Sequence, residues 1–582
     1  MFVVATAGHV DHGKSTLVRA LTGMEPDRFA EERRRGMTID LGFAWTTLPG
    51  GADLAFVDVP GHQRFIANLL SGLGPVPAVL FVVAADEGWS RQSGEHLAAL
   101  RALDVRHAVL AVTRSDLADP APARAEALER LDAAGLADVD AVEVSGRTGA
   151  GLDDLRAALD RLLRRLPAAD PAARVRLWVD RAFTIRGSGT VVTGTLSAGR
   201  IRAGDSLELR GGRVTVRSVQ SLGRGVDEVA AVARVALNLR GVARDDVARG
   251  DVLTTPDAWH RTAVIDARVT AGDLPAELVL HVGTAGVAAR LRPLGDDRVR
   301  VTLDQALPLQ AGDRAVLRDP GRQSVAAGVL VLDADPPALR RRGAAARRAE
   351  ELAGATGRPD PAVEIARRGA VRRRHLVALG VPLDPAADAR AFGDWLVDPD
   401  RWQAWLDAAP TALAGWAVAN PLEPAMPVAA LARELRLPDP TLAGPIATAI
   451  GAVRREGRVS AADQRRGLGA AEASVQRLEA RLAGAPFAAP DAPELAELRL
   501  GTRELAAAER AGRLLRITPE LVLLPSAPAR AVAALRALPQ PFTVSEARQA
   551  WATSRRVALP LLAHLDALGL TERVDDRTRR VV

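Results

Sequence analysis

The sequence contains no cysteine and no tyrosine, and aromatic residues make up only 3% of its 582 residues. The absence of cysteine excludes disulfides, thiol catalysis and cysteine-ligated metals, and it fits a cytoplasmic protein. No apolar run reaches the roughly 18 residues that a membrane span needs, and the N-terminus lacks the pattern of a signal peptide. We therefore expect a cytoplasmic protein that makes no contact with a membrane. We also expect it to act as a monomer.

Basic charge is carried almost entirely by arginine. The isoelectric point of about 10.8 overstates the basicity, because the net charge is only +6 and almost no group titrates between neutrality and the range of arginine. From residue 338 onward, 36 arginines face 28 acidic residues, whereas the preceding part is nearly neutral. The C-terminal surplus points to nucleic acid as a partner of that part.

Lysine occurs once, at Lys14, within the segment Gly8-His9-Val10-Asp11-His12-Gly13-Lys14-Ser15-Thr16. An apolar stretch at 2–7 precedes this segment and a helical stretch at 15–21 follows it, which is the setting of a P-loop. Backbone amides and the helix N-terminus would hold phosphates, Ser15 would reach magnesium, and a compact ammonium would contact the β- and γ-phosphates. The segment therefore predicts binding of a nucleoside triphosphate.

The spacing of apolar and helical stretches predicts a multidomain protein. Residues 1–168 alternate strands and helices and predict an α/β domain with a mainly parallel sheet. Short strands with glycine turns then predict two β-barrels, at 172–257 and 258–337. The helical remainder predicts four winged helices, at 338–408, 409–470, 471–526 and 527–582. The evidence for this array is that Gly457, Gly512 and Gly569 are each expected to end a helix before a short strand, at spacings of 55 and 57 residues.

Three further motifs complete the nucleotide site. Asp58 follows an apolar strand and can hold magnesium through water, while Gly61, three residues later, can turn its amide to the γ-phosphate. Asp116 follows another core strand and can accept two hydrogen bonds from the guanine edge. Ser145-Gly146-Arg147 would add backbone contacts to the base. The order and spacing of these elements predict GTP and its product GDP as the nucleotide, with Mg²⁺ as the metal.

These motifs, together with Arg35-Gly36-Met37-Thr38-Ile39 and Gln92 through His96, resemble the translational GTPases related to elongation factor Tu. The resemblance implies that Thr38 closes on magnesium, that Val10 and Met37 form an apolar gate and that His62 orients the attacking water. Asp11 would stabilise charge near the phosphates. The implied nucleotide-binding set is Asp11, His12, Gly13, Lys14, Ser15, Thr16, Gly61, Thr113, Arg114, Asp116, Leu117, Ser145, Gly146 and Arg147. Thr113 and Arg114 depart from the Asn and Lys of most relatives.

Residues of the first predicted barrel indicate which branch of this family the sequence resembles. Its segment 183–195 is similar to the barrel that binds the aminoacylated end of tRNA in this family. Asp180-Arg181 and the segment beginning at Arg234 resemble the branch of selenocysteine-specific elongation factors. A selenol is more acidic than a thiol, so selenocysteine is anionic at neutral pH. Arg181 and Arg234, oriented by Asp180, would stabilise that charge; a surface ion pair of little energetic value is the alternative.

The resemblance implies a GTP-dependent elongation factor that delivers selenocysteinyl-tRNA to the ribosome at UGA codons by binding an mRNA hairpin (SECIS element). In the last repeat, Arg555 and Arg556 stand where a second helix begins, a place suited to phosphates of an RNA hairpin. A solvated arginine pair is the alternative. Two other functions compete: a general tRNA-delivery or initiation-type GTPase with an unrelated tail, and a winged-helix regulator with an NTPase switch.

Overall fold

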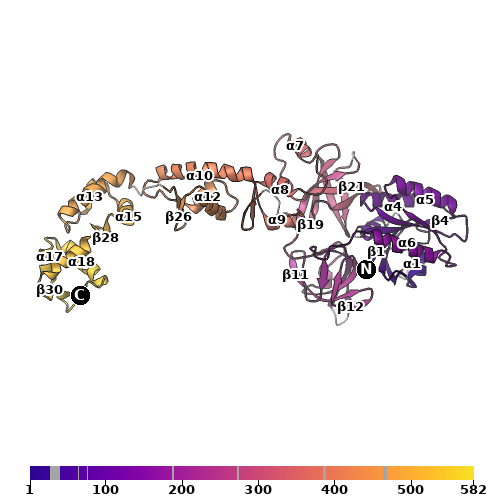
Figure 1. The fold of residues 1–582 in the computed structure, drawn as a ribbon, viewed down its shortest axis with the longest axis horizontal. Coiled ribbons are helices and arrows are strands. Elements are labelled where there is room, and N and C mark those ends of the chain that lie inside the picture. Colours follow the sequence, from indigo (N-terminus) through magenta and orange to yellow (C-terminus); the bar gives the residue numbers. More distant parts are fainter. Residues whose placement is uncertain are drawn as a thin grey trace. The chain divides into compact units, whose positions relative to one another are not determined.

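The computed structural model describes residues 1–26, 38, 40–62, 65–74, 76–185, 189–271, 274–383, 389–462 and 468–582. The chain divides into two compact units, Met1–Asp388 and Ala389–Val582, and Figure 1 labels many of their helices and strands. In the part of the chain that the structure describes, no helix combines the length and apolarity that crossing a membrane requires.

The first domain is built on a six-stranded sheet with the order β2-β3-β1-β4-β5-β6. All neighbouring pairs are parallel except β2 with β3, which is antiparallel. The strands are β1 (Phe2–Ala7), β2 (Gly42–Thr47), β3 (Asp53–Asp58), β4 (Ala78–Ala84), β5 (His107–Thr113) and β6 (Asp140–Glu143). The central strand β4 is buried along its whole length. The sequence pattern predicts the parallel strands but not the edge strand β2.

Helices cover both faces of this sheet (Figure 1). Leucines of α1 (Lys14–Thr22) and α6 (Leu152–Arg165) share a buried core on one face. Buried residues of α3 (Ile66–Leu73), α4 (Arg91–Ala102) and α5 (Ala121–Ala133) form the core of the other face. The phosphate loop connects the end of β1 to the start of α1. It therefore lies at the carboxyl ends of the parallel strands, where α/β sheets place their ligands.

Two barrels follow, as predicted. In the first, β10 pairs with both β15 and β11, so the sheet β10-β15-β7-β8-β14-β11-β12 curls back on itself, with β13-β9 as a separate pair. The second is closed, in the order β16-β19-β18-β17-β20-β21. The strands are β7 (Arg176–Ile185), β8 (Gly189–Leu196), β9 (Arg200–Arg202), β10 (Ser206–Leu209), β11 (Gly212–Ser221), β12 (Arg224–Val226), β13 (Glu228–Ala230), β14 (Ala233–Arg240), β15 (Val252–Thr254), β16 (Arg261–Val269), β17 (Glu277–Val282), β18 (Ala285–Pro293), β19 (Arg298–Pro308), β20 (Arg314–Asp319) and β21 (Ser324–Asp333).

A buried ion network holds the next segment against the second barrel. Arg348 of α7 (Ala344–Glu351) lies 2.7 Å from Asp266 of β16 and 2.5 Å from Asp333 of β21, and all three side chains are buried. Asp266 also receives two bonds from Arg300 of β19, at 2.7 and 3.0 Å. The elements of this segment are α7, α8 (Pro361–Arg368), β22 (Ala370–Arg372) and α9 (Arg373–Ala378). The predicted first winged helix, 338–408, thus spans the division between the two units near residue 388.

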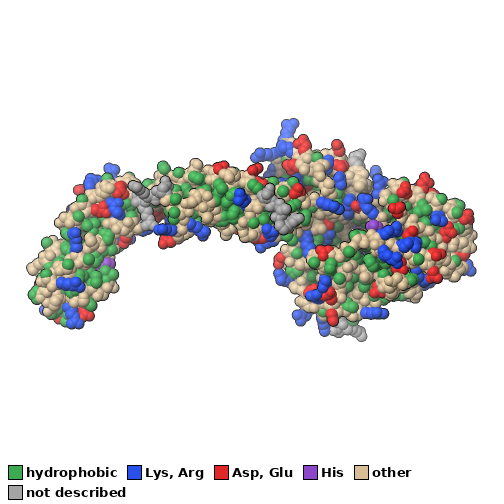
Figure 2. Space-filling model, viewed as in Figure 1, with side chains coloured by type: hydrophobic (Ala, Val, Ile, Leu, Met, Phe, Trp, Pro, Cys, Tyr) green, Lys and Arg blue, Asp and Glu red, His purple; other side chains and the backbone are tan. Residues whose placement is uncertain are grey.

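The second unit consists of short helices and hairpins. Its elements are β23 (Arg390–Phe392), β24 (Trp395–Val397), α10 (Pro399–Ala419), β25 (Met426–Pro427), α11 (Val428–Glu434), α12 (Ala443–Ala449), β26 (Val453–Arg455), β27 (Arg458–Ser460), α13 (Glu472–Gly484), α14 (Ala492–Glu497), α15 (Thr502–Arg510), β28 (Leu515–Thr518), β29 (Leu521–Leu523), α16 (Ala527–Arg536), β30 (Phe542–Thr543), α17 (Val544–Ala550), α18 (Arg555–Ala567), β31 (Thr571–Arg573) and β32 (Thr578–Val581). Arginine and acidic side chains are interspersed over its visible face (Figure 2).

The glycine spacing used to predict the repeats is wrong at its first member. Gly512 and Gly569 do lie at the C-terminal ends of helices α15 and α18, with φ of 70° and 69°. Gly457, in contrast, lies in the turn between β26 and β27, which pair as a hairpin. The glycine at the end of α12 is Gly451, with φ of 67°. A helix end and a hairpin turn both need a residue in the left-handed backbone conformation. A glycine alone therefore does not distinguish one from the other.

The last two predicted winged helices share one hydrophobic core. A single cluster of buried side chains runs from Leu468 to Leu565. Phe487 before α14 packs against Trp551 after α17, with ring centroids 5.5 Å apart. Thr553 donates a 2.6 Å hydrogen bond to the carbonyl of Phe487. Residues 468–582 therefore form one folding body, and removing residues from 527 onward would expose the core of the part that remains.

We expect Asp266→Asn to destabilise the first unit by about 3 kcal/mol, because it leaves Arg300 and Arg348 buried with a weakened partner. Denaturant unfolding of the full chain measures this change. Arg290→Ala is the matched control, since the Arg290–Glu277 pair on the same barrel is about three-quarters exposed on both sides. Equal stability of Asp266→Asn and the control would contradict the role of the network.

Candidate nucleotide site and amino-acid pocket

The phosphate loop depends on backbone conformations that only glycine adopts easily. Gly8, directly after β1, has φ of 128°, and a Cβ there would lie 2.1 Å from the carbonyl oxygen of Val82. Gly13 has φ of 80° and is the N-terminal cap of α1. The loop therefore passes against β4 and turns directly into the N-terminus of α1, the setting in which a glycine-rich loop binds phosphates.

Side chains from other segments hold the loop in this shape. Lys14 is buried, and its Nζ donates to the carbonyls of Gly8 at 3.1 Å and His9 at 2.7 Å. The amide of Gly8 donates to Nδ1 of His96 at 3.0 Å, and that of Val10 donates to Gln92 at 3.3 Å. His96 and Gln92 both belong to α4. Their support of the loop is not evident from their sequence positions alone.

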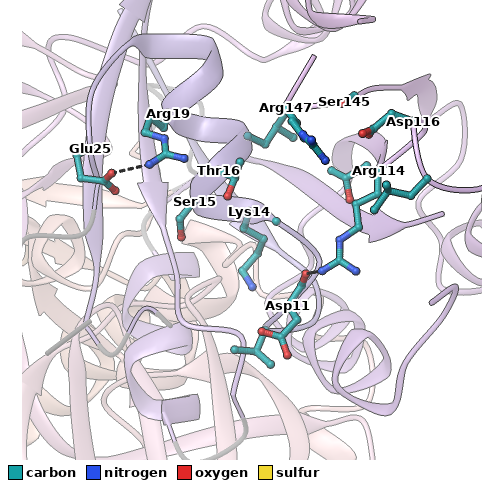
Figure 3. Close-up of a pocket in the computed structure, with 16 residues that line it drawn as sticks. Asp11, Lys14, Ser15, Thr16, Arg19, Glu25, Arg114, Asp116, Ser145 and Arg147 are labelled. Carbon is teal, nitrogen blue, oxygen red and sulfur yellow. Dashed lines mark hydrogen bonds and ion pairs between the residues drawn. The ribbon is translucent and has the colours of Figure 1, made fainter. Parts of the chain in front are cut away.

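A cavity of about 570 Å³ opens beside the loop (Figure 3). All of the predicted nucleotide-binding residues except His12 and Gly61 line it. Asp116, Ser145 and Arg147 lie at one end, and Asp11 and Lys14 lie at the other. The predicted base-reading and phosphate-binding segments, about 100 residues apart in sequence, therefore share one cavity. Arg19 and Glu25, 3.1 Å apart, also line it and were not predicted.

The two exceptions, His12 and Gly61, are buried and do not line the cavity. His12 is fully buried, and its Nδ1 lies 3.3 Å from the carbonyl of Val82. Gly61 lies so close to the loop that a Cβ there would be 2.5 Å from both Nζ of Lys14 and the backbone of Val10. Gly61 thus lies beside the lysine that is expected to contact phosphate, and the turn of its amide to the γ-phosphate stays a prediction.

Three oxygen-bearing side chains meet where the sequence predicts magnesium. Ser15 Oγ donates to Asp58 Oδ2 at 2.6 Å and lies 2.9 Å from Thr38 Oγ1. Asp58 is fully buried, and its other oxygen accepts a 2.7 Å hydrogen bond from Thr6. Hydroxyl and carboxylate oxygens are the ligands that Mg²⁺ prefers, so these residues fit that ion. Across the described ranges no three or more His, Asp or Glu side chains form a metal site.

The base-reading segment is tied to the phosphate loop. Thr113 donates to the carbonyl of His12 at 2.8 Å. Arg114 donates to the carbonyl of Asp11 and to the carboxylates of Asp86 and Glu87. Asp116 itself is exposed, with its side chain available to a base. The guanidinium of Arg114 therefore contacts both the phosphate loop and the two carboxylates.

Of the three residues with predicted roles in hydrolysis, the structure describes two, His62 and Val10. His62 is partly buried, and its ring centroid lies 6.2 Å from that of Phe65. Val10 lines the cavity. Met37, the second member of the predicted apolar gate, lies outside the described residues. The roles of His62 and the gate stay predictions.

In the first barrel, the buried Asp180 of β7 and the partly buried Arg234 of β14 form a bidentate pair, with Arg234 Nη2 2.8 Å from Asp180 Oδ1. Thr193 donates to the same carboxylate at 2.6 Å. Burial alone would raise the pKa of Asp180, but Arg234 and Thr193 outweigh it and hold that pKa below its ordinary value. Asp180 therefore remains charged and orients Arg234.

Arg181, the third predicted pocket residue, faces the first domain. Its guanidinium lies 3.2 Å from Asp40, which also accepts a 3.0 Å bond from Arg249. The ring of Phe43 contacts both pocket arginines, 3.8 Å from the guanidinium of Arg234 and 4.9 Å from that of Arg181. Asp180 thus orients Arg234 but not Arg181, and no sequence pattern indicates the contacts with Asp40 and Phe43.

At the predicted hairpin site, Arg555 and Arg556 are the first residues of α18, after the N-cap Ser554. Both residues are exposed at this helix N-terminus. Arg556, however, turns its guanidinium back and donates to the carbonyls of Ala489 and Pro490, both at 3.1 Å. The two arginines therefore differ: Arg555 faces solvent, and Arg556 joins the last repeat to the one before it.

Family models match four parts of the chain. They are the elongation factor Tu GTP binding domain at residues 1–165, elongation factor Tu domain 2 at 189–254, the β-barrel domain of selenocysteine-specific elongation factor at 275–338 and the winged helix of elongation factor SelB at 533–580. Elongation factor Tu 2 of Streptomyces avermitilis is 32% identical, and the match covers 56% of this chain and 95% of that protein. The chain belongs to the translational GTPase family of elongation factor Tu.

Other matches agree with the selenocysteine-specific branch of that family. The selenocysteine-specific elongation factor of Escherichia coli is 38% identical over 346 residues, which is 58% of this chain and 56% of that protein. The chain thus matches little more than half the length of this relative. The crystal structure of the bacterial selenocysteine-specific factor EF-Sec superposes with a TM-score of 0.79, covering 100% of this chain and 99% of that one at 24% identity. This likeness confirms the predicted fold class: a P-loop α/β domain, two barrels and C-terminal winged helices. The exact domain boundaries stay predictions.

We expect the first domain to lose stability as the pH falls from 6.5 toward 4. Burial lowers the pKa of His96 to about 3 and that of His12 to about 4. In that range the unfolded chain binds protons that the folded chain excludes, so acid favours unfolding, with a slope of about 1.4 kcal/mol per pH unit for each histidine. Protonation of His96 would also remove the acceptor of the Gly8 amide.

Denaturant unfolding at several pH values, for the wild type and His96→Gln, measures this slope. The stability of His96→Gln should depend less steeply on pH, because glutamine does not bind a proton in the unfolded chain as histidine does. His107→Gln, at the partly exposed start of β5, is the control and should keep the wild-type slope. A slope unchanged in His96→Gln would contradict the assignment.

Proposed function

We propose that this chain is a GTP-dependent elongation factor that delivers selenocysteinyl-tRNA to the ribosome at UGA codons by binding an mRNA hairpin. It would act in the cytoplasm and hydrolyse GTP to GDP and phosphate. The first domain supports the nucleotide part of this proposal, because one cavity collects the phosphate loop and the predicted guanine-reading residues, with the predicted Mg²⁺ ligands beside Ser15.

Each part of the nucleotide site has a role in the proposal. Lys14 and the loop amides bind the phosphates, and Asp116 accepts hydrogen bonds from guanine. Ser15 and Thr38 would hold Mg²⁺ directly and Asp58 would hold it through water; the ion supplies charge neutralisation at the phosphates. His62 orients the attacking water, and removing it should slow hydrolysis while leaving binding intact.

The observation that carries the substrate assignment is the charge at the junction of the first domain and the first barrel. Among the described residues, Arg181, Arg234 and Arg249 pair with Asp180 and Asp40, so these five side chains carry one positive charge in excess. An additional anion would balance it. The selenolate of selenocysteine is anionic at neutral pH, whereas serine is neutral, so the excess charge favours the first over the second.

We therefore expect Arg234→Met to reduce the preference for selenocysteinyl-tRNA over seryl-tRNA by about tenfold, the cost of one lost charge-assisted contact. The measurement is protection of each aminoacyl ester from hydrolysis in the presence of the GTP-bound full chain. Arg240→Met, at the exposed end of the same strand, is the control. An unchanged preference with retained tRNA binding would assign Arg234 a structural role.

The hairpin assignment rests on Arg555. We expect Arg555→Ala to weaken binding of the mRNA hairpin and to lower the salt dependence of that binding by about one released counterion. Titrations at two salt concentrations measure both effects, with Arg536→Ala on α16 as the exposed control. Arg556→Ala should instead lower the stability of residues 468–582, because it removes the bonds to Ala489 and Pro490. Hairpin binding that is unaffected by Arg555→Ala would place RNA recognition elsewhere.

A further inference from the structure

The arginine surplus of the C-terminal part is concentrated in one short segment. Residues 338–383 contain 11 arginines and 4 acidic residues, whereas residues 384–582 contain 25 arginines and 24 acidic residues. Nearly all of the excess positive charge therefore belongs to the first compact unit, which also contains the nucleotide cavity and the predicted amino-acid pocket. The remainder, which includes the repeat proposed to bind the mRNA hairpin, is almost neutral.

The arginines of this segment differ in their surroundings. Some are enclosed and paired: Arg348 contacts Asp266 and Asp333, and Arg367 also lies 3.1 Å from Asp333. Others are exposed, and among the described residues these form no ion pair. The exposed, unpaired arginines in and before α7, which we call the α7 patch, are Arg340, Arg341, Arg342 and Arg347.

The backbone brings the residues of the α7 patch together. Arg340–Arg342 belong to the turn that leads into α7, where the amide of Ala344 donates to the carbonyl of Arg341 at 3.0 Å. Arg347 lies one turn into the helix, and its guanidinium reaches back to the N-cap, since a Cβ on Gly343 would be 3.6 Å from Nη1 of Arg347. In Figure 2, basic side chains project from the surface where Figure 1 labels α7.

Contacts on the other side of α7 hold the patch in place. Arg348, next to Arg347 in sequence, faces the second barrel and lies 2.7 Å from Asp266. Leu352, just after the helix, packs in a buried cluster with Leu294 and Leu330. Adjacent arginines thus face opposite sides, one toward the barrel and one toward solvent. A partner that binds the patch does not have to order the helix, which lowers the entropic cost of binding.

The chemistry of the α7 patch fits the backbone of RNA. A guanidinium can donate two parallel hydrogen bonds to a phosphate group, and four such groups without carboxylate partners favour a polyanion. A membrane surface is the other large array of phosphates, but binding to it also needs apolar side chains that enter the lipid. Residues 338–352, all of which the structure describes, expose no large apolar side chain. The patch therefore favours RNA.

We propose that the α7 patch binds the phosphate backbone of the transfer RNA whose aminoacylated end the first barrel is proposed to hold. The patch belongs to the same compact unit as the amino-acid pocket, and that unit carries the excess charge. The inference rests on the proposed delivery of tRNA. Contacts with phosphates carry no sequence information, so the patch adds affinity and leaves selection of the amino acid to the pocket.

The test is titration of the GTP-bound full chain with selenocysteinyl-tRNA at several salt concentrations. Glutamine at all four positions should weaken binding by about tenfold or more and lower the salt dependence by about three counterions. Lysine at the same positions keeps the charge and should keep a salt dependence near that of the wild type. The control removes equal charge from exposed positions of α5 and α6, by Arg124→Gln, Arg161→Gln, Arg164→Gln and Arg165→Gln.

Two neighbouring residues separate RNA binding from stability. Arg347→Gln should lower the salt dependence of tRNA binding by about one counterion and leave denaturant unfolding unchanged. Arg348→Gln should instead destabilise the first unit, because it leaves Asp266 and Asp333 buried with weaker partners. Equal effects of the two substitutions on tRNA binding would contradict the assignment of Arg347 to the patch.

Binding of the other ligands identifies which RNA the patch contacts. The glutamine variant should bind GDP and the isolated mRNA hairpin as the wild type does. Affinity for selenocysteinyl-tRNA within twofold of the control variant would overturn the proposal. A loss confined to the hairpin or to ribosomes would also overturn it and would assign the patch to that RNA. Failure of the wild type itself to bind selenocysteinyl-tRNA would refute the proposed function, and the role of the patch with it.

Discussion

Backbone groups of the phosphate loop cannot pair with one another in the way that strand or helix backbone does, so side chains must satisfy and hold them. In this protein those side chains come from three places. Lys14 accounts for the carbonyls of Gly8 and His9, α4 supplies His96 and Gln92 to two amides, and the end of β5 supplies Thr113 and Arg114 to two carbonyls. The shape of the nucleotide cavity therefore depends on the position of α4 and on the position of β5, which β4 separates from β1 in the sheet. A shift of either element would move the loop. Contacts that α4 or β5 make elsewhere can therefore affect how the loop holds phosphates.

The same dependence extends to the first barrel. In sequence, Asp40 lies between Thr38, which contacts Ser15, and strand β2, and it pairs with Arg181 and Arg249 of the barrel. Phe43 of β2 packs on Arg234, which Asp180 also holds. Only a few residues thus separate the predicted magnesium ligands from the predicted amino-acid pocket. Any rearrangement of the segment around Thr38 would change the charges that face the pocket, which would couple the state of the nucleotide to the affinity for the amino acid.

Sequence alone predicts the parts of this molecule that depend on local pattern. The P-loop, the parallel strands and the two barrels follow from glycine positions and hydrophobic periodicity, and twelve of the fourteen predicted nucleotide residues line one cavity. What it misses depends on tertiary contacts. Gly457 and Gly451 have the same backbone requirement but different elements, so spacing misassigned one repeat. Arg555 and Arg556 are identical in sequence terms, yet only the second meets two carbonyls of the preceding repeat. The shared core of residues 468–582 cannot be predicted from hydrophobic periodicity either. Each helix is amphipathic whether the helix that it packs against lies in its own repeat or in the next one.

The use of arginine instead of lysine has a structural consequence beyond charge. Arg348 contacts three carboxylates, Arg513 contacts Glu472 and Glu479, and Arg114 contacts two carboxylates and a carbonyl. A guanidinium has five donors in a fixed plane and can link segments in this way, while an ammonium concentrates its charge at one point. At Lys14 the surroundings require the compact ammonium of lysine and not the planar guanidinium of arginine. Its Nζ is enclosed by two loop carbonyls and by Gly61, where even a methyl group would lie 2.5 Å away, so a planar fork has no room. The single lysine and the many arginine bridges are thus two consequences of the same difference in side-chain geometry.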